Sequence, residues 1–257
     1  MIRYSEEEGF IKPTGIRFRE GQDEYVILPK IAVGVFSHHL FRDVIQRFSC
    51  REVGYMKTAN FERDIYILEY KGEKITFFMA GVSGPYICDD IEELHAQGVE
   101  KFIIFGNCGV LDSKIEDCSI IIPTMAFRDE GASQHYWPDS ETIDLNPKYK
   151  EEFIELLGEY KFDYTMGYTW TIDAFYRETR DKIEYYKSKG AVCVEMEGAT
   201  IAAVCKRKKL DYFTFYYAGD NLDCNEWDER SLMGHVNLDK KKEVMSLALD
   251  LALKIKD

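Results

Sequence analysis

The stretch Ala191-Val-Cys-Val-Glu-Met-Glu-Gly-Ala199 decides how the fold of this chain is interpreted. Its first four residues form a short apolar run, which is typical of a buried strand. Residues 196–209 predict a helix with apolar side chains on one face, and residues 211–218 predict a second buried strand rich in Phe and Tyr. The sequence therefore predicts one β-α-β unit with carboxylates directly after both of its strands.

These carboxylates indicate a ligand site. In β-α-β units the ligand lies beyond the C-terminal ends of the strands, so we expect Glu195, Glu197 and Asp220 to line one pocket. An ionised carboxylate accepts hydrogen bonds from two adjacent sugar hydroxyls, whereas a desolvated carboxyl keeps its proton and can donate it. The combination predicts cleavage of a nucleoside. Each acidic cluster taken alone is equally typical of a helix terminus or a turn.

Composition limits the function classes. The chain has 257 residues, 46% of them hydrophobic, which is enough for one large α/β domain over residues 1–257. A net charge of −13 argues against nucleic acid as a partner. Seven cysteines without a Cys-x-x-Cys pair predict free thiols of a cytoplasmic protein and no metal site. The chain shows no signal peptide and no apolar run near the roughly 20 residues that cross a membrane, so no membrane partner is expected.

Apolar periodicity predicts a mixed sheet with helices on both faces, which is a three-layer α/β/α sandwich. The predicted strands are 31–36, 65–70, 75–79, 102–105, 118–122, 165–172, 191–194 and 211–218. The predicted helices are 40–48, 86–97, 146–160, 178–189, 196–209 and 238–256. Polar residues 128–147 predict a long loop.

Three further segments follow predicted strands. Ala80-Gly-Val-Ser-Gly-Pro85 precedes a predicted helix, where glycines let the backbone approach a ligand and the helix N-terminus offers free N–H groups. Phe105-Gly-Asn-Cys-Gly-Val-Leu111 predicts a tight turn that carries the polar side chain of Asn107. Phe175 and Tyr176 fit a stack on a flat base, although aromatic pairs more often fill cores. A plain turn explains the first glycine segment equally well and the second one better.

In this order, these segments resemble nucleoside phosphorylase family I. The family includes purine nucleoside phosphorylases, uridine phosphorylases and methylthioadenosine/S-adenosylhomocysteine nucleosidases. The most specific parts are Val194-Glu-Met-Glu-Gly-Ala199 and Ala218-Gly-Asp220, and Cys50-Arg-Glu-Val53 supports them. The resemblance covers the chain from about Ile31 to the C-terminal helix. It implies an α/β sandwich that assembles as a homodimer or a hexameric trimer of dimers, acts in nucleoside catabolism and nucleotide salvage, and uses no cofactor other than phosphate as a possible co-substrate.

The resemblance also implies roles at the sugar. Glu197 is expected to hold the ribose 2′- and 3′-hydroxyls, and Met196 to pack on the sugar. Val82 is expected beside the ribose, and Glu195 is expected to support the site.

At the base, the resemblance implies that Asp220 is the general acid that protonates N7 of a departing purine, with Arg230 as its positioning partner. Phe175, Tyr176 and Asn107 are expected to contact the base. The uridine-specific members carry a Gln-x-Arg pair after the aromatic pair, and the segment here, Arg177-Glu-Thr-Arg180, does not match it. Asp220 and this mismatch favour a purine over uracil.

The phosphate site departs from the family's pattern. The family's Gly-Asp-Pro-x-Arg segment here is Gly34-Val-Phe-Ser-His38, with a histidine in the place of the arginine. Ile104 stands where the phosphorylases have a second arginine, and Asn107 replaces a Ser or Thr. Only Arg51 matches, a residue that in the family reaches a neighbouring subunit's site. Each lost charged hydrogen bond weakens phosphate binding by roughly 1.5–3 kcal/mol. Three basic residues are candidates to replace the arginines: His38, His39 and Arg42.

Three functions therefore stay open from the sequence. The first is a nucleoside phosphorylase with a rebuilt phosphate site. The second is a nucleosidase, which uses water on the same scaffold and is favoured by the missing arginines. The third is a nucleoside-binding protein without turnover. Glu197 and Asp220 together argue against the third, because a binding protein has little use for a general acid.

Overall fold

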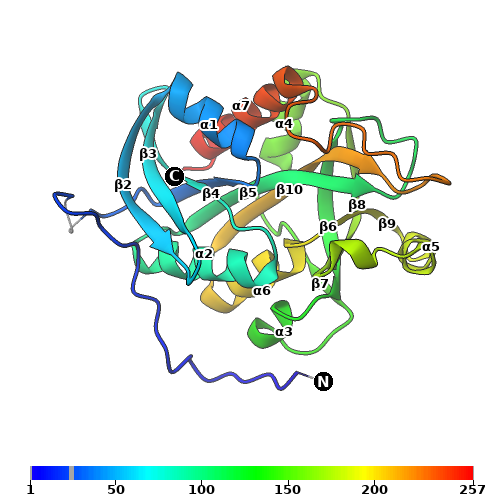
Figure 1. The fold of residues 1–257 in the computed structure, drawn as a ribbon, viewed down its shortest axis with the longest axis horizontal. Coiled ribbons are helices and arrows are strands. Elements are labelled where there is room, and N and C mark those ends of the chain that lie inside the picture. The colour runs from blue at the N-terminus through cyan, green and yellow to red at the C-terminus, as the bar shows by residue number, and fades with distance from the viewer. Residues whose placement is uncertain (1, 23–25, 257) are drawn as a thin grey trace.

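The strands form one mixed sheet (Figure 1), seen here in a computed structural model that describes residues 2–22 and 26–256. The strands are β1 (Ile31–Val35), β2 (Ser49–Lys57), β3 (Glu62–Tyr70), β4 (Glu73–Met79), β5 (Lys101–Val110), β6 (Ile120–Asp129), β7 (Thr142–Asp144), β8 (Tyr164–Ile172), β9 (Ala191–Glu195) and β10 (Asp211–Asn221). The helices are α1 (His38–Arg47), α2 (Gly84–Ala96), α3 (Ser133–Tyr136), α4 (Lys150–Tyr160), the 3-10 helix η1 (Phe175–Arg177), α5 (Arg180–Ser188), α6 (Gly198–Lys208) and α7 (Leu238–Lys254).

Five strands of this sheet close into a ring. The strand order is β10-β6-β8-β9-β5-β1-β4-β3-β2, and β10 pairs with β5 as well as with β6. β1 continues the sheet from β5, and the antiparallel strands β3 and β2 lead to an open edge. The ring gathers the ends of several strands that are distant in the sequence.

Helices cover the sheet on both faces. α1, α4 and α7 lie over one face, and α2 and α6 lie over the other (Figure 1). The core under the first group contains stacked aromatic rings, with the centroids of Phe105 and Phe215 5.0 Å apart. Large buried apolar surfaces of this kind are the main stabilising contribution to such a domain. The predicted three-layer α/β/α sandwich around a mixed sheet is confirmed.

The pairing of β9 and β10 with β5 brings the acidic residues to one site. β10 is parallel to β5, whereas β9 is antiparallel to it, so β5 separates the two strands of the expected β-α-β unit. Gly109 of β5 pairs with Val194 on one side and with Asp220 on the other. A Cβ at Gly109 would lie 2.4 Å from Leu222 Cδ1 and 3.2 Å from Asp220 Oδ1, so only glycine permits this approach. Carboxylates on β9 and β10 therefore meet across a single strand.

The sequence missed one strand, and several of the local predictions are wrong. Residues 49–57 form β2, which has no clear apolar alternation because it is an edge strand with mixed exposure. The expected turn after residue 105 is part of β5, which continues to Val110. The expected loop over 128–147 contains the end of β6, α3 and β7. α4 begins at Lys150 and α5 at Arg180, each later than expected.

Two further expectations concerned the state of the cysteines and membrane-spanning segments. All seven cysteines are free thiols, and five of them are buried. Over the ranges 2–22 and 26–256, none of the helices combines the length and the apolar character that a membrane span requires.

Candidate active site

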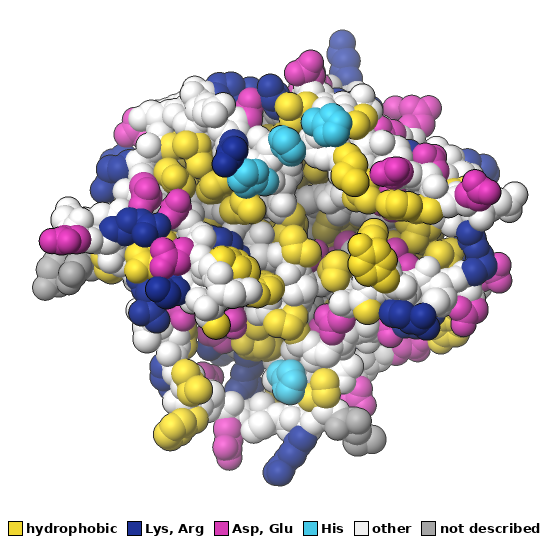
Figure 2. All heavy atoms as spheres, viewed as in Figure 1, with side chains coloured by type: hydrophobic (Ala, Val, Ile, Leu, Met, Phe, Trp, Pro, Cys, Tyr) yellow, Lys and Arg dark blue, Asp and Glu magenta, His cyan; other side chains and the backbone are white. Residues whose placement is uncertain are grey.

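The carboxylates expected to act together line one cavity of about 120 Å³, here called the inner cavity. Glu197 and Asp220 both contribute to it, and the same face of the molecule is hollowed near its centre and bordered by hydrophobic side chains (Figure 2). The inner cavity is lined by Phe36, Val82, Asn107, Cys108, Gly109, Phe175, Glu178, Val194, Glu195, Met196, Glu197, Asp220 and Leu232. A single ligand can therefore contact both carboxyls.

Glu197 is a buried carboxyl at the start of α6, with 6% of its surface exposed. The backbone N–H of Ser83 donates to its Oε1 at 2.6 Å. Burial, together with the nearby charge of Glu195, raises the pKa of Glu197 to about 8. Glu197 is therefore mainly protonated at neutral pH, and a ligand that donates two hydrogen bonds favours its ionised form.

A buried ion pair holds the turn that carries Ser83. Asp90 accepts from the Gly81 N–H at 2.7 Å and from both terminal nitrogens of Arg63, with Nη1 at 2.8 Å. Ser83 has φ 93° and ψ 155°, a backbone region that residues other than glycine rarely adopt. Such a conformation costs on the order of 1–3 kcal/mol. The surrounding contacts hold it in place, and it directs the Ser83 N–H at Glu197.

Glu195 is fully engaged inside the protein. Its carboxylate accepts from the hydroxyls of Thr169 at 3.0 Å and Thr171 at 2.6 Å. It also accepts from the backbone N–H groups of Glu197 at 2.7 Å and Gly198 at 2.6 Å. Those two N–H groups begin α6, so Glu195 fixes the start of the helix and the position of Glu197. With four donors it has little capacity left for a ligand.

Asp220 lies within β10, next to a β-bulge, and is 2% exposed. Burial raises the pKa of Asp220, and the hydrogen bond from Trp227 and the charge of Arg230 oppose that rise. Trp227 Nε1 donates to Asp220 Oδ2 at 2.8 Å. The expected bond from Arg230 is not formed, because its guanidinium donates to the Ile115 carbonyl at 2.8 Å and contacts Asp228. Trp227 is thus the direct partner of the carboxyl, and no sequence pattern pointed to it.

The side chains expected at the sugar and base lie around the inner cavity. Met196 and Val82 line it, and Val82 is exposed. Asn107 also lines it, from within β5 instead of from a turn. Phe175 lines it from η1, whereas Tyr176 is 93% exposed and lies outside it. Phe175 is therefore the better placed of the two to contact a base in the inner cavity.

A fourth carboxyl, Glu178, completes the acidic lining and was not expected there. It lies half-buried between η1 and α5, and burial and the charge of Asp220 raise its pKa to about 8. Among the residues that the structure describes, none donates a hydrogen bond to it. Its neighbour Arg180 donates instead to the carbonyls of Leu222 and Cys224. Nothing in the sequence distinguished Glu178 from an ordinary first residue of the predicted helix over 178–189.

Of the residues expected to bind phosphate, Asn107 lines the inner cavity, whereas Gly34, His38 and Arg51 do not. No Lys, Arg or His is among the described residues that line the inner cavity. His38 is exposed at the N-terminus of α1, and Arg51 is exposed on β2. Gly34 is buried under the ring of Phe78, where a Cβ would lie 2.4 Å from Cζ, so close packing alone explains this glycine. Ser37 caps the N-terminus of α1, because its Oγ accepts from the Leu40 N–H at 3.4 Å.

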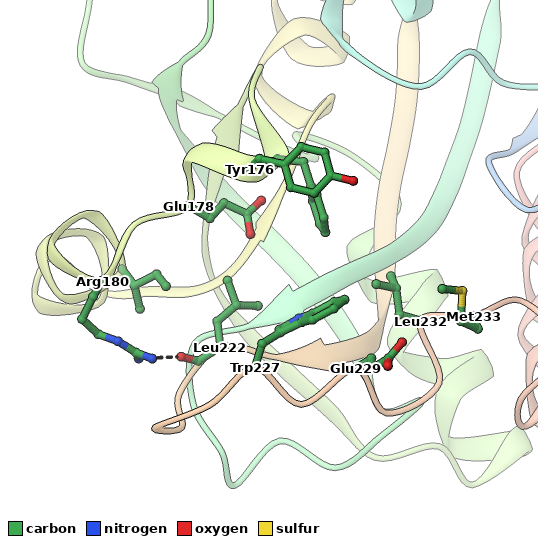
Figure 3. Close-up of a pocket in the computed structure, with 10 residues that line it drawn as sticks. Tyr176, Glu178, Arg180, Leu222, Trp227, Glu229, Leu232 and Met233 are labelled. Atoms are coloured by element: carbon green, nitrogen blue, oxygen red, sulfur yellow. Dashed lines mark hydrogen bonds between the residues drawn. The ribbon is translucent and has the colours of Figure 1, made fainter.

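A second, larger cavity adjoins the first and is here called the outer cavity. It measures about 600 Å³, and Phe175, Glu178 and Leu232 line both cavities. Figure 3 shows the Glu178 carboxyl directed into it, with Tyr176 on one side and Leu222 and Trp227 on the other.

Comparison with known proteins identifies the family to which the chain is similar. A family model described as the phosphorylase superfamily matches residues 30–255. The guanosine phosphorylase of Halorubrum lacusprofundi is 30% identical over 154 residues, which are 59% of this chain and 63% of that protein. The DeoD-type purine nucleoside phosphorylase of Brevibacillus brevis is 27% identical over 195 residues, which are 72% of this chain and 77% of that protein. The chain thus spans less than two thirds of the first of these relatives.

The fold is also that of a solved structure. The crystal structure of the purine nucleoside phosphorylase from Toxoplasma gondii in complex with immucillin-H superposes with a TM-score of 0.79. The superposition covers 97% of this chain and 98% of that one, at 19% sequence identity.

Proposed function

The chain belongs to the phosphorylase superfamily, and on that premise we propose that it is a nucleoside phosphorylase that converts a purine nucleoside and phosphate into free base and ribose 1-phosphate. One observation carries the proposal. A carboxyl suited to bind a diol, Glu197, and a carboxyl suited to donate a proton, Asp220, line the same small cavity. The names of the relatives support the same reaction class.

The proposed mechanism divides the work between these two groups. Ionised Glu197 accepts from the ribose 2′- and 3′-hydroxyls, and its charge favours the positive sugar of the transition state. As the bond from C1′ to the base breaks, the electron pair moves onto the base, and Asp220 donates its proton to N7. Phosphate attacks C1′ and forms the new bond. Met196 packs on the sugar, and Phe175 packs against the base.

The proposal extends to phosphate and assembly. We propose that phosphate lies between the N-terminus of α1, near Gly34 and His38, and Asn107. The exposed position of Arg51 supports an assembly in which the partner subunit's Arg51 completes this site, as a homodimer or a trimer of dimers. No cofactor other than phosphate enters the mechanism. Seven free thiols support a cytoplasmic location.

One observation favours a second function. Four carboxyls line the inner cavity, and none of its described lining residues is Lys, Arg or His. Phosphate carries close to two negative charges, so its binding there requires a compensating positive charge. Water requires none. A phosphate-independent nucleosidase on the same site is therefore the alternative, with a water molecule attacking C1′ in the place of phosphate.

Base release with and without phosphate separates these possibilities. The protein is incubated with inosine, adenosine, guanosine and uridine, and free base is followed by chromatography. Release that requires phosphate supports the phosphorylase, and equal release in its absence identifies the nucleosidase. Asp220→Asn is expected to lower purine release by about 10²–10⁴-fold in either case. Asp239→Asn, on the exposed start of α7, is the matched control. Full activity in Asp220→Asn, or no release with any nucleoside, contradicts the proposal.

A further inference from the structure

The outer cavity is far larger than a purine base needs. Its volume is about 600 Å³, against about 120 Å³ for the inner cavity that holds the diol clamp and the acid. Pockets of about 300–1,000 Å³ with apolar walls are typical of sites that enclose a whole drug-sized molecule. Its walls are mainly apolar, from Phe175, Tyr176, Ile183, Leu222, Trp227 and Met233.

The two cavities adjoin, because both are lined by Phe175, Glu178 and Leu232. A nucleoside whose ribose contacts Glu197 has its base beside Asp220, and both residues line only the inner cavity. A base that packs against Phe175 there has its far edge toward the residues that line both cavities. Whatever the base carries on that edge then enters the outer cavity.

Trp227 lines the outer cavity and also contacts Asp220, the proposed acid. Its indole forms a wall of the outer cavity, and its Nε1 donates to Asp220 Oδ2 at 2.8 Å. The ring of Phe175 faces it across 6.4 Å, edge to face. The two rings are thus in direct contact and form one aromatic wall at the junction of the cavities, against which one face of a flat base can pack.

Glu178 supplies the polar contact at this junction. Its carboxyl points into the outer cavity, and no described residue donates to it (Figure 3). Burial and the charge of Asp220 raise its pKa to about 8, so it is mainly a neutral acid at pH 7 and can both donate and accept. A nitrogen on the outer edge of the base is a suitable partner for such a group.

We propose that the outer cavity binds an apolar group carried on the exocyclic nitrogen of the base, and that the preferred substrates are purine nucleosides with a bulky alkyl or arylmethyl group at that nitrogen. The inference rests on the proposed function, because it needs the ribose on Glu197 and the base beside Asp220. The nitrogen contacts Glu178 at the junction, and the apolar group packs against Leu222, Trp227 and Met233.

The test compares kcat/KM for adenosine and N6-benzyladenosine, each with and without phosphate. Burying a phenyl group is worth about 1.5–3 kcal/mol, so kcat/KM is expected to be about tenfold to a hundredfold higher for the benzyl compound. N6-methyladenosine lacks the phenyl group, and its kcat/KM is expected to stay well below that of the benzyl compound. Equal or lower kcat/KM for N6-benzyladenosine than for adenosine overturns the inference.

A variant tests whether the outer cavity is responsible. Met233→Trp fills the exposed rim of the outer cavity and is expected to reduce the benzyl advantage to less than threefold. Met166→Trp makes the same exchange at an exposed position on β8, outside both cavities, and is expected to keep the advantage. The readout is the ratio of the two substrates, so a general loss of activity does not affect it. An unchanged ratio in Met233→Trp overturns the inference.

Calorimetric measurements of nucleoside affinity test the outer cavity separately from the proposed reaction. If neither nucleoside releases base under any condition, the proposed reaction fails, and the affinities of the two compounds are then measured directly. Tighter binding of N6-benzyladenosine, lost in Met233→Trp, supports the outer cavity as its site. Equal affinities for both compounds overturn the inference independently of catalysis.

Discussion

Replacing Glu197 with Gln is expected to stabilise the fold at neutral pH while removing the diol clamp. Glu197 is buried, and its pKa lies near 8 in the folded protein, against an ordinary value of 4.5. Between those two values the folded state holds a proton that the unfolded state has lost. The stability of the natural protein therefore falls as pH rises through this window. Gln does not titrate, and its carbonyl oxygen can still accept from the Ser83 N–H.

The magnitude follows from the pKa difference. Each pKa unit corresponds to about 1.4 kcal/mol, so at pH 7 the proton linkage costs the natural protein about 3 kcal/mol, and at high pH the limit is about 5 kcal/mol. At pH 5 the cost is below about 1 kcal/mol. The stability advantage of Glu197→Gln is thus expected to grow by about 2–3 kcal/mol from pH 5 to pH 7.

The assay is urea unfolding of both proteins at pH 5, 6, 7 and 8, at one protein concentration. Glu184→Gln, which makes the same exchange at an exposed position on α5, is the matched control. A Glu197→Gln difference that stays flat or shrinks from pH 5 to pH 8 would refute the reasoning, because it would mean that Glu197 ionises as easily in the fold as in the unfolded chain.

The same linkage acts on ligand binding with the opposite sign. A bound ribose donates to ionised Glu197, so binding at pH 7 is expected to release a proton and affinity to rise as pH approaches 8. Calorimetry of nucleoside binding in two buffers of different ionisation enthalpy measures that release. Proton release that persists in Glu197→Gln would assign it to another group.

Two further variants test the neighbouring contacts. Trp227→Phe removes the N–H that favours ionised Asp220, so the alkaline limb of kcat/KM for a purine nucleoside is expected to move to higher pH. Trp137→Phe is the control, and an unmoved limb would show that Trp227 does not tune the acid. Ser83→Gly relieves a φ of 93° and is expected to raise the free energy of unfolding by about 1 kcal/mol; Ser113→Gly is expected to lower it, and a loss of stability in Ser83→Gly would contradict the assigned strain.

The sequence predicted the local helices and strands more accurately than the contacts between them. The apolar stripe that predicted a helix over 86–97 corresponds to α2, and the strand predicted at 191–194 corresponds to β9. β2 was missed because its stability comes from pairing with β3 at the edge of the sheet, which is a long-range contact without a local signal. Glu178 and Trp227 were missed for a similar reason, since each lies in an irregular segment and gains its role from the other strands that surround the cavity.

The convergence of Glu197 and Asp220 in one cavity was expected, but not for the reason that produces it. The expectation used the rule for adjacent parallel strands, and β9 and β10 are neither adjacent nor parallel. What brings their carboxyls together is Gly109, which pairs with both strands and has no side chain to separate them. In the sequence this glycine looked like part of a turn, because a glycine that permits a turn and one that permits close packing give the same local pattern. The distinction depends on Leu222 and Asp220, more than a hundred residues away, and so only the folded chain reveals it.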